Sequence, residues 1–301
     1  MWNSLFILLA LSVSSDLWAA ACCVSQGGIS SLITGDEAIK ASIGAAYSQT
    51  IADAQIDRTV TYRRNDDHEY RLNYSADLGV ILFDRLQLGA TLPWTRRTRT
   101  VGETSRTHTG IGDIRASLAY EILPEWEYSS WRPKAFIFAQ LTIPTGNSIH
   151  TTQGLYTIDV TGRGFFIPSV GGILLKSWGD FDASFSIEAH QPISRSFGDS
   201  QYAPGIGASS ALSFGFTPLN GDIRLGSSIS LSYDQATQVS GLEGGEGEPQ
   251  QLNALSFQIG WAVQDDLSVL LNYQDDLLMG GSHNFPLNRM ASLRIQTQLP
   301  R

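Results

Sequence analysis

The chain has 301 residues, of which 42% are hydrophobic and only 16% are charged, and its formal net charge is −9. This balance argues against a nucleic-acid partner, because proteins that bind nucleic acids usually present a basic surface. Low charge combined with 29 glycines and 10% aromatic residues is also untypical of a soluble α/β enzyme. Beyond the N-terminus, no stretch approaches the roughly 18 consecutive apolar residues that a membrane-spanning helix needs.

The first residues have the pattern of a secretory signal peptide. Residues 5–13 (LFILLALSV) are a short apolar core, and Ala19 and Ala21 form a small-x-small cleavage pattern. No Lys or Arg precedes this core, which departs from the usual basic start of such a peptide. We therefore predict a signal peptide over residues 1–21, with Cys22 as the first residue of the mature chain.

Cys22 and Cys23 are the only cysteines, and three interpretations of them stay open. The AAAC context resembles a bacterial lipobox, which makes Cys22 a possible lipidation site, although Ala19 stands where such a box usually has Leu. A disulfide between adjacent residues is strained. In the third interpretation both cysteines are inert or form mixed disulfides. The predicted barrel itself contains no cysteine, so no framework of disulfides holds it.

Residues 22–38 show no clear period, and we expect a periplasmic lead-in there. A first strand is predicted over residues 39–51 and a polar loop over 52–68. The clearest pattern follows at 70–94, YRLNYSADLGVILFDRLQLGATLPW, which has an apolar residue at every second position on both sides of the break at 83–85. Such alternation indicates β-strands, and two such runs joined by a short turn indicate a hairpin. Each run is long enough to cross a bilayer at a tilt, which takes roughly 9–11 residues.

The same pattern recurs along the rest of the chain. Further strands are predicted at 114–122, 134–143, 165–176, 181–189, 206–216, 223–233, 255–263, 267–273 and 290–299. Short turns at 83–85, 124–133, 178–180, 218–221 and 264–266 alternate with longer polar connections, of which 96–109 is one. Pro168 interrupts its strand, so we expect a bulge or a late start there.

These elements predict an all-β fold: one transmembrane antiparallel up-and-down β-barrel of about twelve strands over residues 39–301. An even number of strands, connections of alternating length and a secretory signal are typical of outer-membrane barrels, and a bilayer requires the sheet to close. We expect both termini and the short turns in the periplasm, in the outer membrane of a Gram-negative bacterium. Outer-membrane lipids and the barrel-assembly machinery are then partners. The rival is a large secreted β-sandwich, in which nothing requires connections to alternate in length.

Aromatic residues near the predicted strand ends favour the barrel, because such residues form girdles at membrane interfaces. They are Trp94 at an outer end and Phe83, Trp178, Phe181 and Trp261 near inner ends. The chain ends Leu299-Pro300-Arg301, whereas many such barrels end on an aromatic residue.

Two segments, GIGDIRASLAYEIL (110–123) and LTIPTGNS (141–148), together with LFDRLQLGATLPW before them, resemble the outer-membrane proteins of the meta-pathway phenol-degradation (aromatic transporter-like) family. The resemblance extends over about residues 70–225. It implies a barrel associated with uptake of aromatic or other small apolar compounds, so a small-molecule solute is the expected cargo.

If the apolar faces meet lipid, the alternating polar residues face the lumen. The charged lumen-facing candidates are Arg71, Asp77, Asp113, Arg115, Lys134, Asp182, Glu188, His190 and Arg224. Two interpretations stay open. Charges of both signs either form a constriction that selects solutes or pair with each other and plug a narrow barrel. The second makes the protein a closed barrel with a structural or assembly role.

Enzymatic function is the weaker expectation. An outer-membrane lipid-modifying enzyme needs a Ser–His pair on the outer surface, whereas His190 falls on the lumen face and no GxSxG motif occurs. The acidic run 243–248 (EGGEGE) offers oxygen ligands for a cation but is more typical of a solvated loop. The histidines show no metal-binding spacing. We therefore predict no catalytic, cofactor or metal site.

Overall fold

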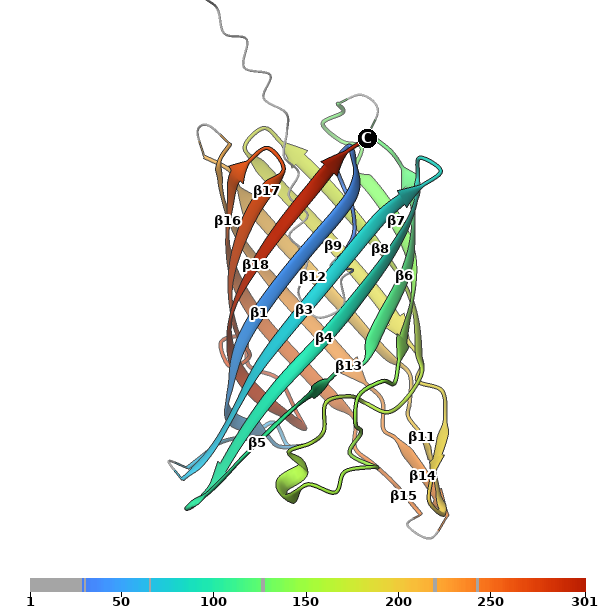
Figure 1. The fold of residues 1–301 in the computed structure, drawn as a ribbon, viewed down its shortest axis with the longest axis vertical. Helices are drawn as coiled ribbons and strands as arrows, with labels where there is room; N and C mark the ends of the chain where they lie inside the picture. The colour runs from blue at the N-terminus through green and yellow to red at the C-terminus, as the bar shows by residue number, and fades with distance from the viewer. Residues whose placement is uncertain (1–28, 30, 65, 126–127, 219–220, 242–243) are drawn as a thin grey trace, which may run out of the picture.

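A computed structural model gives the fold, and it describes residues 29, 31–64, 66–125, 128–218, 221–241 and 244–301. The predicted signal peptide and Cys22 lie outside the described residues. A closed antiparallel barrel of twelve strands dominates the structure (Figure 1). Its strands in order around the wall are β1 (Glu37–Ala54), β3 (Asp67–Leu82), β4 (Leu86–Val101), β6 (Ile114–Leu123), β7 (Lys134–Ile143), β8 (Ile167–Trp178), β9 (Phe181–His190), β12 (Gly207–Phe216), β13 (Ile223–Asp234), β16 (Gln250–Gln264), β17 (Leu267–Asp275) and β18 (Phe285–Pro300).

The barrel closes where the first strand meets the last. β1 pairs with β18 from Glu37 opposite Pro300 to Ala54 opposite Phe285. Every backbone group of the wall can therefore pair, as a lipid environment requires. The fold class predicted from the alternation is confirmed.

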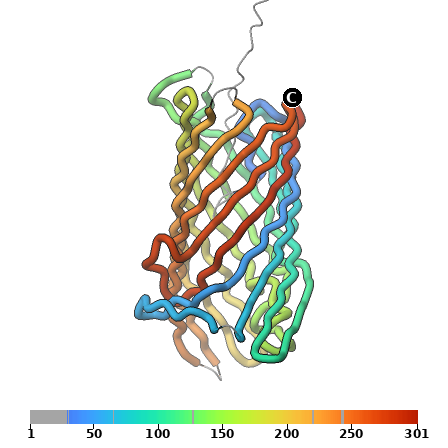
Figure 2. Tube along the Cα trace, turned by 90° about the vertical axis from the view of Figure 1, so that its left-hand side faces the viewer, coloured from blue at the N-terminus to red at the C-terminus, as the bar shows by residue number. Residues whose placement is uncertain are grey.

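The two ends of the barrel differ. At one end, called the turn end here, short connections such as 83–85 and 179–180 join the strands, and β1 begins and β18 ends there (Figure 1). At the other, the loop end, longer segments project beyond the wall (Figure 2). They contain β2 (Val60–Tyr62), β5 (Thr104–Ile111), the 3-10 turn η1 (Leu155–Thr157) and a separate small sheet of β10 (Arg195–Phe197), β11 (Ser200–Ala203), β14 (Gln238–Gly241) and β15 (Gly245–Glu246). Among the described residues, no helix is long and apolar enough to span a membrane.

The wall is apolar outside and polar inside. Large outward side chains are exposed, for example Ile43 at 63%, Val170 at 62% and Ile187 at 52%. The residues between them, such as Ser42, Ser169 and Glu188, are buried. This distribution of apolar and polar side chains is the reverse of that in a soluble protein. It follows from the two-residue period of a strand.

One local prediction needed correction and another is confirmed. Residues 96–109 were expected to be a polar loop, but β4 runs on to Val101 and pairs with β5, with Arg96 opposite Thr109. Both faces of this hairpin are polar, so its alternation carries no hydrophobic signal. The prediction of a bulge or a late start at Pro168 is confirmed by a late start: the strand begins at Ile167, and its pairing with β7 has no bulge, since Pro168 lies in register with Leu141.

Part of the predicted lead-in belongs to the described residues. Of its described residues, 29 and 31–34 are buried against the inner wall near the turn end, 35 and 36 are exposed, and β1 begins at Glu37. The limits of the predicted domains remain predictions.

Candidate functional site

The inner wall carries two side-chain pairs that cross one strand. Arg224 of β13 donates to both carboxylate oxygens of Asp182 of β9, with its Nε 2.7 Å from Oδ2 and its Nη2 2.5 Å from Oδ1. The strand between them is β12, and Gly215 lies opposite Asp182 there. A Cβ on Gly215 would come within 2.1 Å of the Arg224 side chain. Glycine at this position therefore makes room for the pair.

The second pair repeats this arrangement toward the loop end. His190 Nε2 of β9 lies 2.7 Å from Asp234 Oδ1 of β13. Gly207 of β12 is opposite both residues, and a Cβ there would meet both side chains within 2.3 Å. His190 thus has a carboxylate partner on the same face of the wall.

Asp77 is buried in the wall formed by β1, β3 and β4. Ser42 donates to its Oδ2 at 3.1 Å and Thr91 to its Oδ1 at 2.8 Å. Arg294 of β18 forms an ion pair with it, with Nη1 3.2 Å from Oδ2. A buried carboxylate is tolerated when it is paired and hydrogen-bonded in this way.

Glu69 forms ion pairs with three arginines near the loop end. Its carboxylate is only 3% exposed and accepts hydrogen bonds from Arg63 at 3.2 Å, Arg71 at 2.8 Å and Arg97 at 2.8 Å. Arg97 also donates from Nη1 to the carbonyl oxygen of Thr157 at 2.6 Å. One guanidinium therefore links the wall to η1, in the segment between β7 and β8.

Asp113 holds the same segment at two further points. It lies between β5 and β6, and its oxygens accept the backbone N–H of Gly146 at 3.0 Å and of Arg163 at 2.7 Å. Asp113 thus fixes the two ends of residues 146–163 rather than standing as a free charge in the lumen.

Aromatic contacts join this segment to the small sheet. His150 packs on Phe197, with ring centroids 4.6 Å apart, and on Tyr202 at 4.1 Å. Phe165 meets Phe197 edge to face at 5.7 Å. Burial lowers the pKa of His150 from its ordinary value, because a charged imidazole is disfavoured away from water. The neutral ring therefore serves as part of an apolar cluster.

Arg115 differs from the other predicted residues. Its side chain is exposed within the barrel, and it has no hydrogen bond or ion pair to any described residue. Its electrostatic neighbours are Asp77, Glu188, Arg163 and Asp113. Arg115 is therefore a cation that faces the open space of the bore.

At the turn end, the lead-in occupies a seat on the inner wall, defined here by Lys40, Gln87, Lys134, Phe136 and Phe138. Gln87 makes a reciprocal pair with the backbone of Ile33, accepting its N–H at 2.9 Å and donating to its carbonyl at 2.7 Å. Lys40 donates to the carbonyl of Leu32 at 2.9 Å, and Lys134 donates to that of Thr34 at 2.5 Å. Two ammonium groups thus bind carbonyl oxygens of the lead-in.

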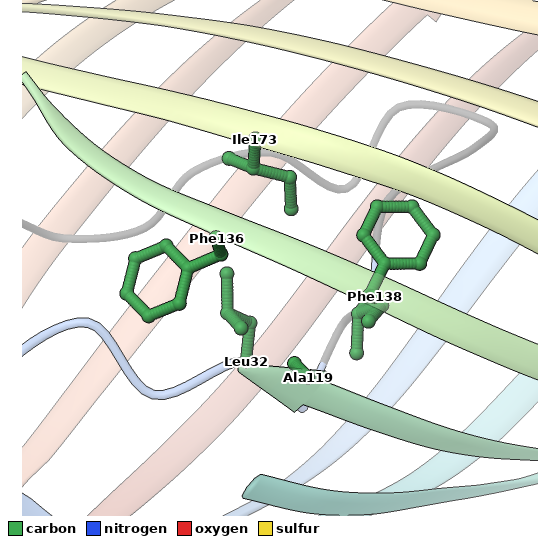
Figure 3. Packing of buried hydrophobic residues seen from close by; sticks show 6 residues of the cluster. Leu32, Ala119, Phe136, Phe138 and Ile173 are labelled. Atoms are coloured by element: carbon green, nitrogen blue, oxygen red, sulfur yellow. The ribbon is translucent and has the colours of Figure 1, made fainter. Parts of the chain in front are cut away.

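The apolar part of the seat receives Leu32. Figure 3 shows the Leu32 side chain between the rings of Phe136 and Phe138, with Ala119 and Ile173 nearby. Ile29 belongs to the same buried cluster. These inward phenylalanines lie at the polar positions of the predicted alternation, so the expected lumen face is partly apolar here.

Two glycines leave space on the wall for Ser31. Gly79 and Gly89 face each other across β3 and β4. A Cβ on Gly79 would lie 2.1 Å from the Ser31 carbonyl oxygen, and one on Gly89 would lie 2.0 Å from its Oγ. The wall is therefore shaped to the lead-in.

The structure brings most of the predicted charges together in pairs, through partners that alternation alone did not reveal. Asp234 and Arg294 were missed as partners, because pairing across an intervening strand depends on register. Glu69 was missed for another reason: it lies on β3 two residues before Arg71, just outside the run of alternation that begins at Tyr70. Glycines at 207 and 215, eight residues apart on one strand, are the sequence signal for two such crossings. In the acidic run 243–248, Glu243 lies outside the described residues and Glu246 belongs to β15. Within the described ranges, no group of three or more metal-ligating side chains occurs.

No protein-family model matches the sequence, and no curated protein matches it. Among solved structures, an outer membrane channel from Pseudomonas putida F1 is similar with a TM-score of 0.64 at 14% identity, over 89% of this chain and 100% of that one. This likeness shows the fold: the two chains share the architecture of a closed β-barrel.

Two more structures are similar at lower scores. The transport unit of the autotransporter AIDA-I from Escherichia coli has a TM-score of 0.48 at 9% identity, over 90% of this chain and 93% of that one. The monoaromatic hydrocarbon channel CymD has a TM-score of 0.44 at 8% identity, over 88% of this chain and 90% of that one. These scores are too low to carry an argument about function.

Proposed function

We propose that this protein is a channel for small solutes, apolar or aromatic ones among them, in the outer membrane of a Gram-negative bacterium. The observation that carries the proposal is the exposed guanidinium of Arg115 inside a closed barrel whose outer face is apolar. A free charge inside a barrel indicates hydrated space, since an unpaired charge in a dry interior is costly. The resemblance to aromatic transporter-like proteins supports the solute class. The proposal assigns no enzymatic activity.

A closed barrel with a structural or assembly role is the second candidate. The lead-in on its seat and the paired wall charges favour it, because both fill the bore. The two candidates differ in whether the lead-in and segment 146–163 leave a path for solutes.

Conductance of the purified mature protein in planar bilayers, together with solute uptake into liposomes, tests the proposal. A channel gives ion current and flux of small solutes. Replacing Arg115 by Gln removes a cation from the bore, so the ion selectivity should shift toward cations. Arg301→Gln, a change at the chain end outside the bore, is the matched control. A correctly folded barrel with neither current nor flux establishes the closed candidate instead.

A further inference from the structure

We propose that the lead-in seat is a binding site for a small aromatic carboxylate, and that the lead-in occupies this site in place of the solute. The inference rests on the proposed channel function and names its solute class. It follows from what the lead-in presents to the wall: an apolar side chain and two oxygen atoms.

The apolar half of the site suits an aromatic ring. Leu32 lies between Phe136, which is 1% exposed, and Phe138, which is 5% exposed, and Ile173 adjoins them. An aromatic ring of similar size gains the same burial and adds favourable contacts with the two phenylalanine rings. The site is therefore suited to a single flat ring rather than to a hydrated sugar.

The polar half of the site recognises oxygen. The ammonium groups of Lys134 and Lys40 each bind a carbonyl oxygen of the lead-in, at 2.5 and 2.9 Å, and Gln87 adds an amide donor. An ammonium binds a carboxylate more strongly than a neutral carbonyl, because both partners then carry charge. Glu121, 3.3 Å from Lys134, is the opposing charge at the site.

The exposed Arg115 extends this preference along the bore, with Asp77, Glu188 and Asp113 as the carboxylates in its neighbourhood. Asp77 is held by Arg294, Ser42 and Thr91. A solute with an apolar ring and a carboxylate meets a cation first in the bore and again at the seat. A neutral aromatic hydrocarbon can contact the phenylalanines but has no group that pairs with these cations.

The test measures binding of benzoate to the full mature protein by calorimetry or ligand-observed NMR, with benzyl alcohol and acetate as probes that lack one half of the chemistry. Benzoate should bind at least about tenfold more tightly than either, because only benzoate has both the ring and the carboxylate. This difference corresponds to about 1.4 kcal/mol of binding free energy. Leu32→Gly weakens the competing lead-in and should tighten benzoate binding. In that background, Lys134→Met should weaken it by about tenfold.

Lys176→Met is the matched control, because Lys176 lies at the same end but contacts Glu125 and Tyr128 of the turn between β6 and β7 rather than the lead-in. It should leave benzoate binding unchanged. Equal binding of benzoate and benzyl alcohol, or no effect of Lys134→Met in the Leu32→Gly background, overturns the site. The conductance and uptake experiment separates the two proposals, since a barrel that passes solutes without preferring benzoate retains the channel function and refutes only the site.

Discussion

Arg224 and Asp182 bind each other across β12, a strand to which neither belongs, and Gly215 lies under their contact. The pair fixes β9 and β13 relative to each other through side chains as well as through backbone pairing. Barrel rigidity at this point therefore depends on a residue that has no side chain.

Gly215→Val should destabilise the barrel by about 1–3 kcal/mol, the usual cost of inserting atoms into a packed site. The new side chain has to displace the Arg224–Asp182 pair. The urea midpoint of the folded, unheated gel form measures the loss. Gly245→Ala in β15 is the control, because nothing lies within 4 Å of a Cβ there, and an equal loss in both variants rules out a special role for Gly215.

Gly79→Val should release the lead-in while leaving the wall intact. Its Cβ would lie 2.1 Å from the Ser31 carbonyl oxygen, and a backbone atom cannot rotate away as a side-chain end can. Valine is itself favourable in a strand. Single-channel current in planar bilayers should rise above that of the unmodified protein. Gly172→Ala, where the nearest atom is the Phe136 carbonyl oxygen at 3.5 Å, should not change the current.

Arg97→Ala should loosen the segment around η1, because it removes the hydrogen bond to Thr157 and one of the three arginines at Glu69. Trypsin should then cleave after Arg163 several-fold faster, a rate read from the fragments on a gel. Arg96→Ala is the neighbouring control, since Arg96 is exposed and points to the opposite face of β4. Unaltered cleavage in Arg97→Ala contradicts the link.

Acidification should open the aromatic cluster at the loop end. Burial puts the pKa of His150 in the folded protein below its ordinary value of 6.5, so the opened state takes up a proton first as the pH falls. The stability contributed by neutral His150 is present above about pH 6.5 and is lost below it. The protection of the amides of residues 148–166 against hydrogen exchange, corrected for the slower intrinsic exchange in acid, should be weaker at pH 5 than at pH 8. His150→Phe should abolish this difference, and a difference that persists assigns it to another group.

The chemical state of Cys22 in the mature chain remains a prediction. Mass spectrometry of the mature chain decides between the interpretations, because acylated Cys22 has a mass that a free thiol or a mixed disulfide does not share. A free Cys22 eliminates lipidation and leaves signal cleavage alone.

The barrel could be predicted from the sequence because one physical constraint repeats along it. Each strand that crosses an apolar layer must alternate, as β7 and β9 do almost to the residue. The hairpin of β4 and β5 escaped prediction because both of its faces meet water, so Arg96 and Thr109 obey no such constraint.

The interior was harder to predict because it depends on register and on contacts distant in sequence. Alternation assigns Asp182 and Arg224 to the same face, but only the pairing through β12 brings them together. The position of Leu32 has no periodic signal, since Lys40, Lys134 and Gln87 bind the backbone of the lead-in and a single buried apolar side chain sets no period. The lead-in seat does have a signal in the sequence: Phe136 and Phe138 stand at positions where the lumen face is expected to be polar.

The chain has only three lysines, at 40, 134 and 176. Lys40 and Lys176 are buried and Lys134 is largely covered, so arginine supplies the accessible side-chain cations of the described surface. Amine-directed reagents should therefore react poorly with the barrel wall while the lead-in is seated, and Lys40 and Lys134 should gain reactivity when it leaves. The protein thus carries a built-in chemical reporter: the extent of lysine modification gives the fraction of barrels whose lead-in has left, without any engineered label.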